Sequence, residues 1–205
     1  MDHSEESTAL FQALEADGEL PLRLRTAPWC MPGSGEAEWK ELARSIGTGG
    51  RRWSIEAIKL FVDGTVDNGT AWLYEADIHG QSTAPFWPRP EEYSAAVRYF
   101  ASRGIPTATH AIGDAGVDHV LEALESLRNN VPADILHRTV HRIEHIETVP
   151  DELVARFKAQ AWWPACSRPI APTTHLPITA TTGLRALARS GRTGHGAAVI
   201  FATPE

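Results

Sequence analysis

The stretch HAIGD at residues 110–114 lies where a short apolar segment, residues 105–110, passes into an amphipathic helical pattern, residues 114–128. The stretch HRIEH at residues 141–145 also ends an extended segment that precedes a helical pattern. In a parallel α/β fold such a position is the carboxyl end of a strand, where side chains converge on a site. A single histidine there is often a core residue. Two imidazoles at successive strand ends are typical of ligands to a first-row metal ion.

The segments around these motifs alternate between extended and helical patterns. Extended patterns cover residues 20–26, 58–62, 105–110 and 140–145, and helical patterns cover residues 9–15, 36–46, 91–103 and 114–128. A further helix is expected after Thr148, with Thr148 as its N-cap and Pro150 in its first turn. This alternation predicts an α/β fold with a parallel sheet.

Length and composition limit what the chain can be. A complete (β/α)₈ barrel takes about 250 residues, so a chain of 205 residues can hold only part of one. The net charge of −7 argues against a nucleic-acid partner. No apolar run has the length of a membrane span. Cys30 and Cys166 give neither a disulfide framework nor zinc-knuckle spacing, and residues 1–8 have no signal-peptide pattern, so we expect a cytoplasmic protein.

Within HRIEH, strand alternation predicts that His141, Ile143 and His145 point to one face and that Arg142 and Glu144 point to the other. His145 lies nearest the carboxyl end and is the better candidate ligand, whereas His141 is interpreted as a structural residue deeper in the sheet.

In the other motif, His110 is the last strand residue before the turn. Asp114 is the N-cap of the following helix, a carboxylate that orients an imidazole, or both.

Lys59 lies one residue inside the segment IKLFV and shares a face with Phe61 and Asp63. A lysine that points into a barrel is costly unless it is paired or modified. One solution is carboxylation, because the resulting carbamate can bridge two metal ions. The other is an outward-facing lysine that pairs with a helix. Spacing alone leaves both open.

A long loop at residues 65–90 follows this strand, and loops of that length are usually functional. Its aromatic residues either line an apolar pocket for a small molecule or pack the loop onto the sheet; they are Trp72, Tyr74, Phe86 and Trp87.

Taken together, IKLFVDG with the following GTA, then HAIGD, then HRIEH resemble the amidohydrolase superfamily, specifically amidohydrolase family 3, over roughly residues 20–160. The resemblance implies a distorted (β/α)₈ TIM barrel that holds one or two divalent metal ions, with zinc expected, and hydrolyses amide-like bonds with a metal-activated water. It implies Lys59 as the carboxylated ligand of strand four, His110 as the ligand of strand five and His145 as the ligand of strand six. The chain is then a partial barrel covering roughly strands three to six.

Two features of the family pattern are missing. The family's His-x-His pair after the first barrel strand does not occur in this sequence, and neither does the aspartate that follows the eighth strand. Half of the family's metal site therefore has no residues to form it.

The composition and periodicity of the sequence change after residue 160. Because tryptophan has a single codon, the gene around Trp162 and Trp163 can be partly reconstructed, and one inserted nucleotide before the codon of Ala161 permits the reading GVVASMQPTH. That string resembles the family's seventh strand with its QPTH motif. We therefore predict two regions: a partial hydrolase barrel at residues 1–160, and an irregular, out-of-frame tail at residues 161–205, where His175 and His195 are discounted as ligands. The alternative is a genuine divergent C-terminus.

These observations predict an amidohydrolase-type hydrolase that acts on C–N bonds of a small amide-like molecule and is inactive as this fragment. Lys59, His110 and His145 would hold the metal and Asp114 would support it. Two other hypotheses remain: a non-catalytic fragment of a decayed or mis-sequenced gene, and a small-molecule binding module. Neither a nucleic acid nor a membrane is expected as a partner.

Overall fold

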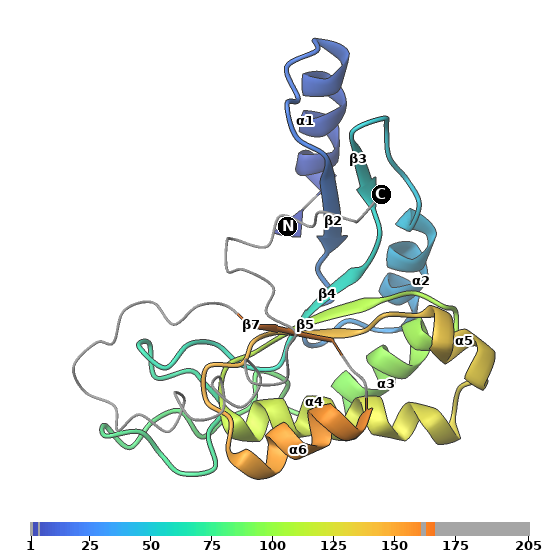
Figure 1. Cartoon of the computed structure of the whole chain (residues 1–205). Coiled ribbons are helices and arrows are strands. Elements are labelled where there is room, and N and C mark those ends of the chain that lie inside the picture. The colour runs from blue at the N-terminus through green and yellow to red at the C-terminus, as the bar shows by residue number, and fades with distance from the viewer. Residues whose placement is uncertain (1, 4, 161–162, 167–205) are drawn as a thin grey trace.

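The computed structural model describes residues 2–3, 5–160 and 163–166 of the chain (Figure 1). Strands and helices alternate along most of it. The strands are β1 (Asp2–His3), β2 (Leu24–Pro28), β3 (Trp53–Ile55), β4 (Ile58–Phe61), β5 (Thr107–Ala111), β6 (Arg142–His145) and β7 (Trp163–Cys166). The helices are α1 (Glu5–Ala16), α2 (Glu36–Ser45), α3 (Pro90–Ala101), α4 (Asp114–Ser126), α5 (Ala133–Arg138) and α6 (Asp151–Gln160), with a 3₁₀ turn at Leu127–Asn129.

The sheet that carries both histidine motifs has the strand order β4-β5-β6-β7, and every neighbouring pair in it is parallel. One row of the register joins Lys59, Ala108 and Arg142, and the row nearer the carboxyl ends joins Phe61, His110 and Glu144. Residues that are partners in a parallel register point to the same face. The parallel α/β sheet predicted from the alternation of patterns is therefore confirmed.

A second sheet, of order β1-β2-β3, is also parallel and runs into the first. Strand β3 passes almost directly into β4. The residues just beyond β2 lie alongside β4. Trp29 forms an isolated parallel bridge with Lys59, and the amide of Cys30 donates to the Lys59 carbonyl at 2.8 Å. Strand β2 therefore flanks β3 and then β4, which places it beside the larger sheet.

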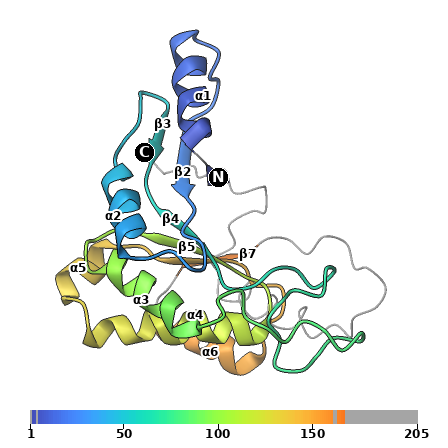
Figure 2. The same ribbon diagram turned by 180° about the vertical axis from the view of Figure 1, so that it is seen from behind.

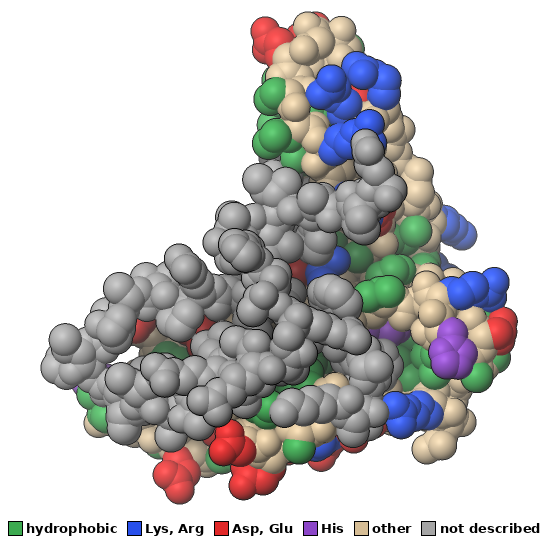
Figure 3. Space-filling view, viewed as in Figure 1, with side chains coloured by type: hydrophobic (Ala, Val, Ile, Leu, Met, Phe, Trp, Pro, Cys, Tyr) green, Lys and Arg blue, Asp and Glu red, His purple; other side chains and the backbone are tan. Residues whose placement is uncertain are grey.

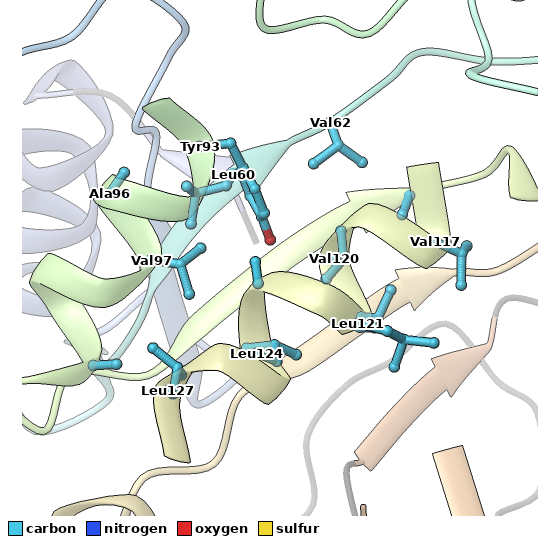
Figure 4. Close-up of a cluster of buried hydrophobic side chains, with 14 of the residues drawn as sticks. Leu60, Val62, Tyr93, Ala96, Val97, Val117, Val120, Leu121, Leu124 and Leu127 are labelled. Atoms are coloured by element: carbon cyan, nitrogen blue, oxygen red, sulfur yellow. The ribbon is translucent and has the colours of Figure 1, made fainter. Parts of the chain in front are cut away.

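Helices α3, α4 and α6 lie together against one face of the larger sheet, as both views show (Figures 1 and 2). The apolar stripe expected for residues 114–128 faces that sheet and is fully buried. Its side chains meet Leu60 of β4, Val62 just after β4, and Tyr93 and Val97 of α3 in one core (Figure 4). The stripe consists of Val117, Val120, Leu121, Leu124 and Leu127.

Three local expectations were wrong or incomplete. The strand expected at residues 20–26 lies at Leu24–Pro28, and β3 and α5 were not expected. Thr148 is not the N-cap of α6, because that helix starts at Asp151 and the carbonyl of Pro150 accepts its first N–H bonds. Thr148 instead donates its amide and hydroxyl to the Ile112 carbonyl, at 3.0 and 2.8 Å.

The described part of the region predicted to be an irregular tail is regular. Strand β7 (Trp163–Cys166) pairs with all of β6, so irregularity is contradicted for those four residues. The rest of the region, with His175 and His195, lies outside the described residues, and the out-of-frame interpretation stays a prediction.

Charge of both signs is exposed on the face shown in Figure 3. Lys and Arg side chains gather on the lobe that carries α1, β2 and β3, and Asp and Glu side chains lie along the opposite edge. Within the described part of the chain, no helix has the length and apolar character needed to cross a membrane.

His141 lies inside the molecule, 1% exposed, and its Nδ1 lies 2.9 Å from the Thr107 hydroxyl. This position agrees with the structural role expected for it. Burial lowers the pKa of His141 from 6.5 to about 4, because the interior disfavours the charged ring.

We therefore predict that His141 makes stability depend on pH. Between pH 6.5 and pH 4 the unfolded chain takes up a proton at this residue and the folded chain does not, so the free energy of unfolding falls by up to about 1.4 kcal/mol per pH unit as pH is lowered. Urea unfolding at several pH values should show a shallower dependence for His141→Gln. The exposed His137→Gln is the control and should parallel the wild type. A His141→Gln curve parallel to the wild type would contradict the prediction.

Candidate functional site

The imidazoles of His110 and His145 meet at the carboxyl ends of adjacent strands β5 and β6. Their ring centroids are 4.4 Å apart, with the planes inclined by 59°. Zinc–nitrogen bonds are about 2.0–2.1 Å long, so two imidazoles that share an ion must lie next to each other, as these two rings do. The structure therefore brings together the two histidines that the sequence singled out.

His145 reaches His110 through an unusual backbone conformation. Its φ is +78° and that of Ile146 is +54°, in the left-handed region that β-branched residues rarely adopt. The expected alternation put His145 on the face of His141 and Ile143, and this was wrong. Those two side chains are buried, whereas the left-handed turn brings the His145 ring to His110. Strand periodicity could not reveal this turn, because it assumes extended backbone to the last residue.

Lys59 lies on the same face as His110 and two residues farther from the carboxyl ends of the strands. It is 5% exposed and forms an ion pair with Glu144 of β6, which also accepts a bond from Arg142 Nε at 3.0 Å. Burial opposes ionisation of Glu144, but the Lys59 and Arg142 cations outweigh it and lower its pKa to about 2. The alternative of an outward-facing lysine paired with a helix is therefore wrong. The partner of Lys59 is Glu144, a residue of the neighbouring strand β6.

The carbonyl of Gly64 sets the orientation of the His110 ring. His110 Nε2 lies 2.9 Å from that oxygen. A carbonyl only accepts hydrogen bonds, so Nε2 carries the proton and the lone pair of the neutral ring is on Nδ1. Nδ1 is then the atom through which His110 could bind a metal ion. Orientation of a histidine by such a backbone acceptor is a common feature of metal sites.

A buried carboxylate, Asp63, lies directly behind His110. Its side chain is 0% exposed, and Oδ1 is 3.7 Å from His110 Nε2. Its two oxygens accept the backbone N–H groups of Ile112, Gly113 and Trp72, at 3.0, 2.7 and 3.0 Å. Burial raises the pKa of Asp63 to about 6, although these three N–H donors oppose the rise. This role of Asp63 was not predicted from the sequence. The only sequence feature that pointed to it was the Asp63-Gly64 pair after a predicted strand.

Asp114 does not contact His110 through any bond described for it. Gly113 occupies the N-cap position of α4. The Asp114 carboxylate accepts the amides of Ala115 and of Tyr74 in the long loop, at 2.8 and 2.9 Å. The acidic side chain next to the imidazole is thus Asp63, while Asp114 holds the loop against α4.

The long loop is packed at some of its aromatic residues and exposed along much of its length. Trp87 is 1% exposed and donates its indole N–H to the Phe61 carbonyl at 2.8 Å, and the Trp72 ring lies against His119. Tyr74 and Phe86 are 58% and 45% exposed. Trp87 therefore fixes the loop to the sheet and Trp72 fixes it to α4, so two of the four aromatics fit the packing interpretation.

The donors for a metal ion are incomplete in the described part of the chain. No group of three or more His, Cys, Asp or Glu side chains gathers there with the spacing of a metal site. His110 and His145 are two candidate nitrogen donors, and Lys59, the third residue implied by the family resemblance, is paired with Glu144.

Comparison with known families agrees with the motifs. The amidohydrolase family (family 3) matches residues 1–190, and the chain belongs to that family. The family predicted from the sequence is thus confirmed. No curated protein matches the chain.

Two solved structures are similar to the chain. Both are described as uncharacterized metal-dependent hydrolases, one from Pyrococcus horikoshii OT3 and one from Pyrococcus furiosus. The first is 26% identical with a TM-score of 0.61 over 82% of this chain. The second is 27% identical with a TM-score of 0.62 over 80% of this chain. The chain spans 32% of the length of each.

The ion pair at the site gives a stability prediction. Glu144→Gln leaves Lys59, whose side chain is 6% exposed, without its charge partner. We expect a loss of about 3 kcal/mol in the free energy of unfolding, because a buried charge left unpaired is strongly destabilising. Urea unfolding followed by circular dichroism measures this loss.

The matched control is Asp134→Asn, which breaks an exposed pair with Arg138, 72% and 75% exposed. It should cost less than about 1 kcal/mol. If the two substitutions cost the same small amount, the Lys59–Glu144 pair is not a buried, stabilising contact.

Proposed function

We propose that this chain forms part of a metal-dependent amidohydrolase, in which His110 and His145 hold a divalent metal ion. The metal we propose is zinc. The reaction is hydrolysis of an amide-like C–N bond in a small molecule. The observation that carries the proposal is the 4.4 Å approach of the two imidazoles at the ends of neighbouring parallel strands. Membership of the amidohydrolase family and the likeness to two metal-dependent hydrolases support it.

The fold we propose is a partial (β/α)₈ barrel covering strands three to six. Strand β2 is then barrel strand three, β3 and β4 together are strand four, and β5 and β6 are strands five and six. Two observations support this. The bridge between Trp29 and Lys59 joins β2 to β4 in one parallel series. Helices α3, α4 and α6 cover one face of the sheet, as the outer helices of a barrel do (Figure 2).

The two histidines suit a divalent metal ion, but they do not complete its ligand set. Imidazole nitrogen is a good ligand for zinc, and the Gly64 carbonyl leaves the lone pair of His110 on Nδ1. Catalytic zinc sites have three protein ligands. Lys59 would be a third, as a carbamate, once its nitrogen left Glu144. A bound metal supplies Lewis acidity and lowers the pKa of water. The chain itself orients the imidazoles and, through Asp114 and Tyr74, holds the loop beside them.

A second candidate is a non-catalytic fragment. It is favoured by the donor set of the described residues, in which no group of three His, Cys, Asp or Glu side chains forms. On this basis we propose that the 205-residue chain binds metal but does not turn over an amide. A binding module without metal has less support, because Trp87 packs the loop onto the sheet and Trp72 packs it onto α4.

Metal binding tests the proposal. We expect the purified chain to bind about one zinc ion after equilibrium dialysis, measured by elemental analysis. His110→Ala and His145→Ala should each lose most of that zinc, because each removes one of two nitrogen ligands.

The control is His137→Ala, an exposed histidine on α5 that lies in neither motif. It should bind zinc as the wild type does. Circular dichroism must show that all variants are folded. A wild type that binds no zinc, or equal binding by all four proteins, would contradict a metal site at His110 and His145.

A further inference from the structure

The segment Asp63-Gly64 contacts His110 from two directions. The Gly64 carbonyl meets the imidazole at Nε2, and the Asp63 carboxylate holds the backbone just beyond His110 through Ile112 and Gly113. We propose that Asp63-Gly64 is the positioning element of this site: it fixes the tautomer and direction of the His110 ring and locks the residue 65–89 loop against the start of α4. The importance of this for metal binding rests on the proposed function above.

The carboxylate of Asp63 links three separate segments of backbone. It lies just after the end of β4, and it accepts N–H groups from the β5–α4 turn and from Trp72 in the loop. Each hydrogen bond to a buried anion is charge-assisted and therefore stronger than a neutral one. Displacement of this one side chain would release the turn and the loop together.

Gly64 depends on a tight local turn. Its amide donates to the Thr70 carbonyl at 2.8 Å, and the Thr70 hydroxyl accepts the amide of Thr65 at 3.0 Å. A Cβ on Gly64 would collide with the Thr70 side chain. Glycine is thus required here for close approach, and the turn holds the Gly64 carbonyl where it meets His110.

Two further glycines make room for the same contacts. A Cβ on Gly113 would collide with the Trp72 backbone, and a Cβ on Gly116 would lie 2.9 Å from Asp63 Oδ2. The Gly116 amide also donates to the Trp72 carbonyl at 3.0 Å. The loop therefore crosses the first turn of α4 at a distance that side chains would prevent.

If Asp63 served only to fix the turn before α4, its bonds to the N–H groups of Ile112 and Gly113 would be sufficient. The side chain does more, because it also binds the loop and places Oδ1 3.7 Å from His110 Nε2. An anion at that distance favours the proton on Nε2 and hence the lone pair on Nδ1. The same carboxylate thus favours the ring form that could accept a metal ion and holds the backbone on which the ring is mounted.

Asp63→Asn tests the proposal, since its amide NH₂ group would face N–H donors that now meet a carboxylate. In metal-free protein labelled with ¹⁵N-histidine, the His110 signals, identified by their loss in His110→Ala, should report Nε2–H for the wild type and a mixture of tautomers for Asp63→Asn. Zinc affinity should fall about 10- to 100-fold, as for other residues that orient metal-binding histidines.

The matched control is Asp77→Asn in the same loop. Asp77 also accepts two backbone amides and a hydroxyl, from His79, Gln81 and Ser82, but it contacts neither His110 nor the β5–α4 turn in any bond described for it. It should leave the His110 tautomer and the zinc affinity at wild-type values. A general effect of loosening the loop would instead appear in both variants, and that result would overturn the proposal.

Gly116→Ala provides a second variant in case Asp63→Asn does not fold. Alanine favours the helix more than glycine does, but its methyl group presses on Asp63 Oδ2. We expect the same change in tautomer, with a smaller loss of zinc affinity. Wild-type tautomer signals in both folded variants would overturn the proposal. If the wild type binds no zinc, the proposed function fails, while the metal-free tautomer signals still decide the role of Asp63.

Discussion

The structure depends on one buried carboxylate that accepts hydrogen bonds from three backbone amides. Asp63 lies two residues after β4, and its oxygens bind the turn after β5 and the loop that follows β4. The turn after β6 joins the same assembly, because Thr148 donates twice to the Ile112 carbonyl. Three consecutive strand ends are therefore fixed to one another. This is the condition under which histidines from β5 and β6 can meet.

The two faces of the larger sheet have opposite characters. The face toward α3, α4 and α6 is an apolar core (Figure 4). The other face carries Lys59, Glu144 and the two histidines, so its polar groups must satisfy one another. The Lys59–Glu144 pair does so within the sheet and holds the lysine nitrogen away from a metal. Any role of Lys59 as a ligand requires this pair to open, which couples metal binding at the site to the charge of Glu144.

The sequence predicted the parts of the fold that follow from periodicity. The stripe of α4 and the parallel strands around HAIGD and HRIEH were found, and the family they suggested is confirmed. Short elements such as β3 and α5 were missed because three to six residues carry too little periodic signal. The site was predicted less completely. The left-handed turn at His145, the Lys59–Glu144 pair and the role of Asp63 all arise from contacts between segments far apart in sequence, which local spacing does not encode.

The central claim is that strand ends fixed by Asp63 bring His110 and His145 to one metal ion. X-ray absorption spectroscopy of the zinc-loaded chain tests it most directly, because imidazole ligands give a characteristic multiple-scattering pattern. The account predicts two imidazole nitrogens at about 2.0–2.1 Å from zinc, and loss of one imidazole contribution in His145→Ala. A zinc ion surrounded by oxygen ligands without imidazole scattering would contradict it.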